Sequence, residues 1–158
     1  MNTVWAPTSV TRAESFLWYK AHPRLQLGIA FLWKQTAFRF LASVQLSPET
    51  ATMPAVNASA GIQGIGTGNP GYSVTLEKNF NPGGHRVNAY IGIGFRANES
   101  HTHAVGGVKF ALNQNWTVGY QHDGHQQNPF VTFGQGQAFG GIYLLNFERP
   151  ALMFGMKF

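Results

Sequence analysis

The nine residues LQLGIAFLW (25–33) alternate between two kinds of side chain, and this alternation decides the fold class. Large apolar residues occupy every odd position of the stretch, and glutamine, glycine, alanine and leucine lie between them. A period of two residues is typical of a β-strand whose two faces meet different environments. The stretch therefore predicts a strand with one large apolar face and one face that is mostly small or polar.

The same alternation recurs along the chain. It is found at residues 38–46, 56–63, 72–77, 86–96, 104–112, 116–121 and 151–158, and less cleanly at 128–135 and 138–147. Together with 25–33 these segments predict about ten strands, within a range of 8 to 12. Residues suited to tight turns separate the strands, which leaves no room for crossover helices. We therefore expect an all-β fold, an antiparallel up-and-down β-barrel.

The first 23 residues lack this clear pattern and are interpreted as an N-terminal extension, so that the barrel covers residues 24–158. Within the extension, Ser9 to Ala21 is predicted as a helix capped by Thr8 or Ser9, or as one added strand. The start MNTVWAPTSV lacks the basic region and apolar run of a signal peptide. We expect it to be a mature start preceded by an added methionine.

The amino-acid composition argues against several classes of protein. Charged residues make up only 11% of the chain, well below the roughly 25% of an ordinary soluble domain. The net charge is +5, but the 11 basic residues are scattered singly, which argues against a nucleic-acid partner. The absence of cysteine excludes disulfides and thiolate metal sites. No apolar run is long enough for a transmembrane helix.

Charged residues within the predicted strands lie on one face only. The large apolar face has no ionised group in mid-strand, whereas the small and polar face carries four isolated charges: Arg39, Glu77, Arg96 and Lys109. Membrane barrels have this arrangement, with apolar side chains outside and polar ones in the lumen. We expect Glu77 to pair with one of the three cations across the lumen. A soluble lipocalin-like barrel, the alternative, would place its large apolar side chains inside.

Aromatic residues are expected at the two rims, because tryptophan and tyrosine favour the membrane interface. Counting through the turns places Trp116, Phe80 and Phe158 at one rim, and Trp33, Phe38, Tyr72, Phe95 and Tyr120 at the other. These positions predict two aromatic belts.

The C-terminal stretch LMFGMKF (152–158) has alternating apolar residues and a final phenylalanine. It resembles the assembly signal of bacterial outer-membrane β-barrel proteins. The resemblance implies a Gram-negative outer membrane as location, both chain ends in the periplasm, and the lipid bilayer as a partner. It also implies contact with the outer-membrane assembly machinery through the last strand. A protein partner in a larger envelope complex is a further expectation.

With the C-terminus periplasmic, four of the six histidines gather at the external rim: His101, His103, His122 and His125. Glu99, Gln121 and Asp123 are near them in sequence. A His-x-His pair on a strand turns both rings to one face, and imidazole with carboxylate is a ligand set for divalent metals. The alternative is that these histidines are simply polar residues tolerated in exposed loops. No bound cofactor is expected.

The stretch WTVGYQHDG (116–124) resembles the strand that carries the catalytic histidine in the lipid A deacylase and outer-membrane phospholipase barrels. Those families pair the histidine with a serine two positions later. His122 matches the histidine, but Gly124 stands at the serine position, so the nucleophile is missing. Ser100 in the neighbouring external loop is the alternative nucleophile.

These observations favour an outer-membrane barrel with a structural or protein-interaction role and no catalysis. Two alternatives stay open. One is a lipid hydrolase that uses His122, and the other is a soluble lipocalin-like barrel that binds a ligand.

Overall fold

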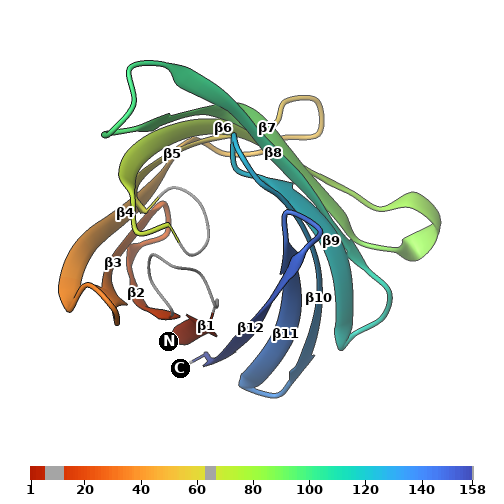
Figure 1. Cartoon of the computed structure of the whole chain (residues 1–158). Coiled ribbons are helices and arrows are strands. Elements are labelled where there is room, and N and C mark those ends of the chain that lie inside the picture. The colour runs from red at the N-terminus through yellow and green to blue at the C-terminus, as the bar shows by residue number, and fades with distance from the viewer. Residues whose placement is uncertain (6–12, 63–66, 158) are drawn as a thin grey trace.

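The computed structural model describes residues 1–5, 13–62 and 67–157, which form one closed barrel of twelve strands (Figure 1). The strands are β1 (Asn2–Trp5), β2 (Ala13–His22), β3 (Leu25–Leu32), β4 (Ala37–Ser47), β5 (Ala55–Ile62), β6 (Pro70–Phe80), β7 (Val87–Arg96), β8 (Thr102–Ala111), β9 (Trp116–His122), β10 (Gln127–Gln135), β11 (Ala138–Leu145) and β12 (Arg149–Met156). A 3₁₀ turn, Pro82–Gly84, lies between β6 and β7.

Every strand pairs antiparallel with its neighbours in the chain, and β1 closes the barrel against β12. The predicted all-β, antiparallel, up-and-down barrel is thus confirmed. The expected number of about ten strands is corrected to twelve, because β1 and β2 come from the segment interpreted as an extension. β1 is too short to show a period, and the run FLWY at 16–19 is apolar on both faces of β2. Of the segment Ser9 to Ala21, predicted as a helix or an added strand, residues 9–12 lie outside the described residues and the remainder is strand β2, so the helix is corrected to a strand there.

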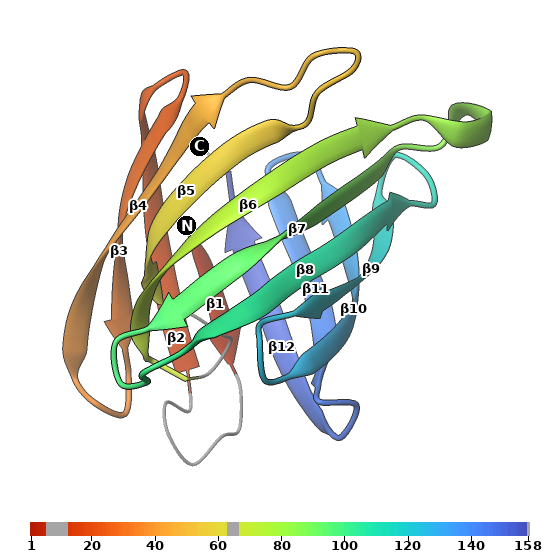
Figure 2. The ribbon, with the colours of Figure 1, turned by 90° about the horizontal axis from the view of Figure 1, so that it is seen from above.

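Different turns and loops lie at the two ends of the barrel, and both chain termini lie toward one of them (Figure 2). The terminal rim carries Asn2 and Met156 together with the turns that follow β2, β4, β6, β8 and β10. The opposite rim carries the β7–β8 loop (97–101) and the β9–β10 loop (123–126). We call this second end the histidine rim, since His101, His103, His122 and His125 all lie at it.

Large apolar side chains point outward around the barrel. They include Leu17, Tyr19, Leu27, Ile29, Phe40, Val74, Leu76, Ile91, Ile93, Val108, Ile142, Leu152 and Phe154, all exposed. Phe40, in β4, is 85% exposed. Side chains of the alternate register point inward, as the period of two requires.

The inward side chains leave a polar cavity of about 760 Å³. It is lined mostly by Gln, Ser, Thr and Asn side chains, with Arg24, Glu77 and Lys109 as charged members. Glu77 accepts hydrogen bonds from Asn57 (2.8 Å) and Asn88 (2.7 Å), rather than pairing with the cations considered for it. Arg39 donates instead to the carbonyl of Phe38 (3.1 Å). A glutamate between two amide donors is well solvated by the protein itself.

A small apolar core fills the barrel beside the β1–β12 seam. Val4, Leu145 and Ala151 are buried there, and Phe16, Tyr143 and Met153 pack against them. Buried polar groups accompany this core toward the histidine rim: Glu14, Arg96, Asp123 and Asn128. The backbone N–H of Gly68 donates to Glu14 (3.1 Å). The interior is therefore packed in part and hollow in part.

The aromatic residues singled out from the sequence lie near strand ends. Trp33, Phe38, Tyr72, Phe95 and Tyr120 lie toward the histidine rim, and Phe80 and Trp116 toward the terminal rim. Phe158 lies outside the described residues. Trp33 is 57% exposed, contacts Phe31 edge-on and donates its indole N–H to Ser15 (2.9 Å).

In the described part of the chain there is no helix long and apolar enough to cross a membrane.

Candidate functional site

Two adjacent hairpins bring the candidate site together at the histidine rim. β7 ends at Arg96, the loop after it carries Glu99, and His103 is the second residue of β8. β9 pairs with the other side of β8, and the loop that follows it carries His125. The site therefore depends on the register of three neighbouring strands.

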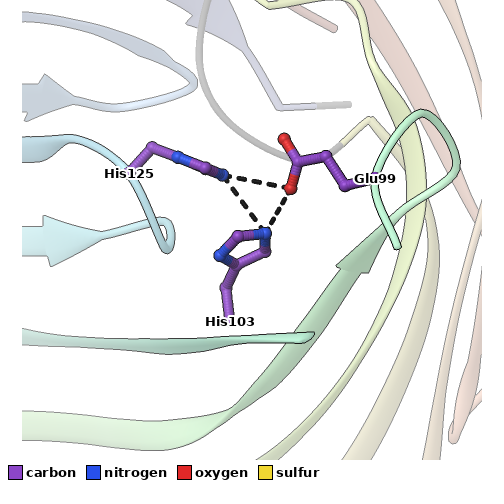
Figure 3. A group of neighbouring side chains, drawn as sticks. All are labelled: Glu99, His103 and His125. Carbon is purple, nitrogen blue, oxygen red and sulfur yellow. Dashed lines mark hydrogen bonds and ion pairs between the residues drawn. The ribbon is translucent and has the colours of Figure 1, made fainter. Parts of the chain in front are cut away.

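Glu99, His103 and His125 point toward one another (Figure 3). The Nε2 atom of His125 lies 3.1 Å from Glu99 Oε2 and 3.2 Å from the Nε2 atom of His103. His103 Nε2 also contacts Glu99 Oε2. Three ligand atoms from three side chains thus form one small triangle.

Burial increases from one side of this triangle to the other. The side chain of His125 is 39% exposed, that of Glu99 17% and that of His103 8%. Partial desolvation by itself raises the pKa of Glu99, but the hydrogen bonds and charges of His125 and His103 outweigh it and lower that pKa below its usual value. The carboxylate is therefore ionised at neutral pH, and His125 is the most exposed of the three side chains.

A buried ion pair supports the triangle from behind. Arg96 Nη2 lies 3.3 Å from Asp123 Oδ1, and Arg96 Nη1 lies 3.7 Å from Glu99 Oε1. Asp123 Oδ1 also accepts the backbone N–H groups of His125 (3.0 Å) and Gln126 (2.8 Å). Arg96 thus holds one oxygen of Glu99 while Asp123 shapes the loop that carries His125.

Gly124 allows the two loops to approach. Its φ of +97° is a backbone conformation that glycine adopts easily, and a Cβ atom there would lie 2.5 Å from the Cβ of His103. The β9–β10 loop can therefore pass directly over His103 only because residue 124 has no side chain.

The other candidates lie apart from the triangle. The exposed His101 ring is 4.5 Å from the His103 ring, but no atom of His101 belongs to the triangle. His122 continues the outward face of β9, and its Nδ1 lies 3.2 Å from the carbonyl oxygen of Gln126. Within the described ranges no serine or threonine hydroxyl hydrogen-bonds with His122, and Ser100 is exposed in its loop.

The sequence alone predicts His103 and His125 as candidate ligands but gives Glu99 and Arg96 no role in this site. Glu99 is only a sequence neighbour of the histidines, and Arg96 is predicted to lie in the lumen. The spacing Arg-x-x-Glu-x-x-x-His over residues 96–103 was a signal that one strand end and its loop hold all three groups. Its meaning depends on the loop conformation, which spacing alone does not specify.

Comparisons of the chain with protein-family models, with curated proteins and with solved structures found no match.

Proposed function

We propose that the protein is a membrane-spanning barrel of a bacterial outer membrane with a non-catalytic, structural or protein-interaction role. The observation that carries the proposal is the ring of outward apolar side chains around a polar interior. Burying apolar area in lipid gains roughly 25 cal/mol per Å², so a surface of this kind is stable in a bilayer and prone to association in water. A lipocalin-like barrel is disfavoured, because its ligand would meet a cavity lined mostly by amides and hydroxyls.

Adjacent residues of one strand offer a direct test of this arrangement. Leu76 points outward from β6 and is 45% exposed, whereas Thr75 lines the lumen cavity. The chain has no cysteine, so Leu76→Cys and Thr75→Cys each introduce one thiol without further changes. Both variants are refolded into liposomes and treated with a water-soluble maleimide and, separately, with a lipid-soluble one.

We expect the thiol at position 75 to react with the water-soluble reagent through the lumen. The thiol at position 76 should react only with the lipid-soluble reagent. Equal, fast reaction of both thiols with the water-soluble reagent would contradict a membrane-spanning barrel. A wild-type chain that formed a monodisperse β-protein in buffer without detergent would also contradict it.

The non-catalytic part of the proposal rests on the surroundings of His122. Acyl transfer needs a nucleophile that a base activates within hydrogen-bond reach, and His122 faces the Gln126 carbonyl instead. We expect the refolded chain to release no fatty acid from phospholipid or lipid A vesicles. Acyl release that disappears in His122→Ala and persists in His85→Ala, a control at the terminal rim, would contradict this part of the proposal.

The loops and the last strand are the surfaces proposed to contact protein partners. The loops of both rims extend from the barrel, and β12 presents its outward side chains Leu152 and Phe154 beside the seam. By its resemblance to outer-membrane assembly signals, β12 is also the element proposed to contact the assembly machinery. Assembly into outer membranes in cells, compared between wild type and Phe154→Ser, tests that contact. Equal assembly of both would contradict it.

A further inference from the structure

We propose that Glu99, His103 and His125 form a binding site for a divalent transition metal, with zinc as the best fit, that fastens the β7–β8 loop to the β9–β10 loop. All contacts of the site lie within the chain, so this inference goes beyond the proposed membrane role and does not depend on it.

The spacing of the three ligand atoms agrees with a single ion. Zinc binds imidazole nitrogen at about 2.0–2.1 Å and carboxylate oxygen at about 2.0–2.2 Å, so tetrahedral ligands lie about 3.3 Å apart. His125 Nε2 lies 3.1 Å from Glu99 Oε2 and 3.2 Å from His103 Nε2. Both separations are within a few tenths of an ångström of this value. His103 Nε2 and Glu99 Oε2 are in closer contact than that, so these two atoms must move apart to admit the ion.

The chemistry of the contacts points the same way. Both rings turn the same nitrogen, Nε2, toward one carboxylate oxygen and toward each other. If both nitrogens carried protons to donate to Glu99, those protons would also face one another. A cation between the three atoms accepts one lone pair from each of them and removes this conflict. Imidazole with carboxylate is a set suited to Zn²⁺ and its neighbours and poorly suited to Ca²⁺ or Mg²⁺, which prefer oxygen ligands alone.

The surrounding residues act as the outer support that metal sites need. Arg96 contacts the far oxygen of Glu99, which leaves Oε2 to face the histidines. Asp123 binds Arg96 and holds the backbone of the His125 loop. Counting Arg96, Asp123 and Glu99, with neutral imidazoles, the local charge is about −1, which favours a cation. The exposed side at His125 leaves a fourth position for water.

The test uses the full chain without a histidine tag, refolded in detergent micelles, and titrates it with Zn²⁺ by calorimetry. We expect one site per chain in the wild type. Glu99→Gln, His103→Ala and His125→Ala should each weaken Zn²⁺ binding at least tenfold. His101→Ala and His85→Ala should stay within about threefold of the wild type, since neither residue belongs to the triangle. Ca²⁺ and Mg²⁺ should not compete.

A second set of measurements begins with the wild-type chain. Zn²⁺ should protect His125 of the wild-type chain from carbethoxylation, read by mass spectrometry, while His101 and His22 stay reactive. Zn²⁺ should also raise the temperature at which the folded gel band converts to the unfolded one, in the wild type and not in Glu99→Gln. Unchanged affinity in the three ligand variants, equal losses in His101→Ala, or no protection of His125 would overturn the proposal.

Discussion

The guanidinium group of Arg96 lies 3.3 Å from the Asp123 carboxylate, and both side chains are almost completely buried, at 7% and 4% exposure. Removal of one partner leaves the other as an uncompensated buried charge, which typically costs about 3–5 kcal/mol. We therefore expect Asp123→Ala to lower the free energy of unfolding by about this amount, measured by urea titration in a lipid or detergent environment. Asp123 also holds two backbone N–H groups, so Arg96→Met should cost less than Asp123→Ala.

The double variant separates the pair from its surroundings. Because each single change breaks the same interaction, the two losses should not add. Glu148→Gln, an exposed acid in a loop at the same rim, is the control and should change the unfolding free energy by less than about 0.5 kcal/mol. Additive losses would mean that the ion pair contributes nothing.

Gly124→Ser places a hydroxyl where the lipid-hydrolase pattern has its serine, and we expect it to damage the site rather than create an enzyme. A left-handed conformation costs a non-glycine residue about 1–2 kcal/mol, and the new Cβ would also collide with His103. The prediction is a loss of stability, weaker Zn²⁺ binding and no acyl release from lipid vesicles.

Gly136→Ser is the matched control for this change. Gly136 also has a positive φ, of +61°, but a Cβ there meets nothing within 4 Å. It should lose stability through backbone strain alone and keep the wild-type affinity for Zn²⁺. Equal Zn²⁺ affinity of the two serine variants would show that residue 124 does not position His103.

Tryptophan fluorescence distinguishes the inner surface from the outer one. Trp18 lines the lumen cavity, whereas Trp33 and Trp116 point outward near opposite rims. In variants that keep one tryptophan, with phenylalanine at the other positions, brominated lipids should quench Trp33 and Trp116 strongly and Trp18 weakly. Iodide in water should quench Trp18 more than either of them. The reverse order would mean that the apolar surface does not face lipid.

A loop at the terminal rim should respond to acid. Glu49 in the β4–β5 loop accepts hydrogen bonds from the Asn79 amide (2.6 Å) and backbone (3.0 Å), and Lys78 lies 3.6 Å away. The Asn79 contacts are the main cause that lowers the pKa of Glu49 below its usual 4.5. A lowered pKa in the folded state means that this contact stabilises the loop above about pH 4.5, and that the effect is lost as the pH falls through the lowered pKa.

Hydrogen exchange of the β4–β5 loop is the measurement for this effect. We expect faster exchange at residues 50–53 below pH 4 than at pH 7, after correction for the intrinsic rates. Lys78 donates to the carbonyls of Thr50 (2.6 Å) and Ala51 (3.0 Å), so Lys78→Met should loosen the loop at both pH values. In Glu49→Gln the acid-dependent part should disappear. A Glu49→Gln variant that still loosened in acid would assign the effect to another group.

The sequence predicts those strands in which apolar and polar residues alternate without interruption. Strict alternation in 25–33 and 86–96 is enough to predict strands, and the inward position of Glu77 and Lys109 follows from it. For β2 the sequence left a helix and an added strand as alternatives, because Phe16, Leu17, Trp18 and Tyr19 are large on both faces. Trp18 faces inward and lines the lumen cavity. The site was predictable only in composition. Glu99 meets His103 and His125 through loop geometry that no residue period encodes.

The seam between β1 and β12 has a consequence for how the molecule forms. β1 is four residues long, whereas most other strands have eight to eleven, yet its pairing with residues 152–155 alone turns an open sheet into a tube. These partners are separated by nearly the whole chain. Pairing them therefore has a large entropic cost of loop closure, and the short β1 forms few hydrogen bonds to offset it. Closure should therefore come last in folding, and the tube should first unroll along this line. A reversible opening here would expose two strand edges that can pair with another chain.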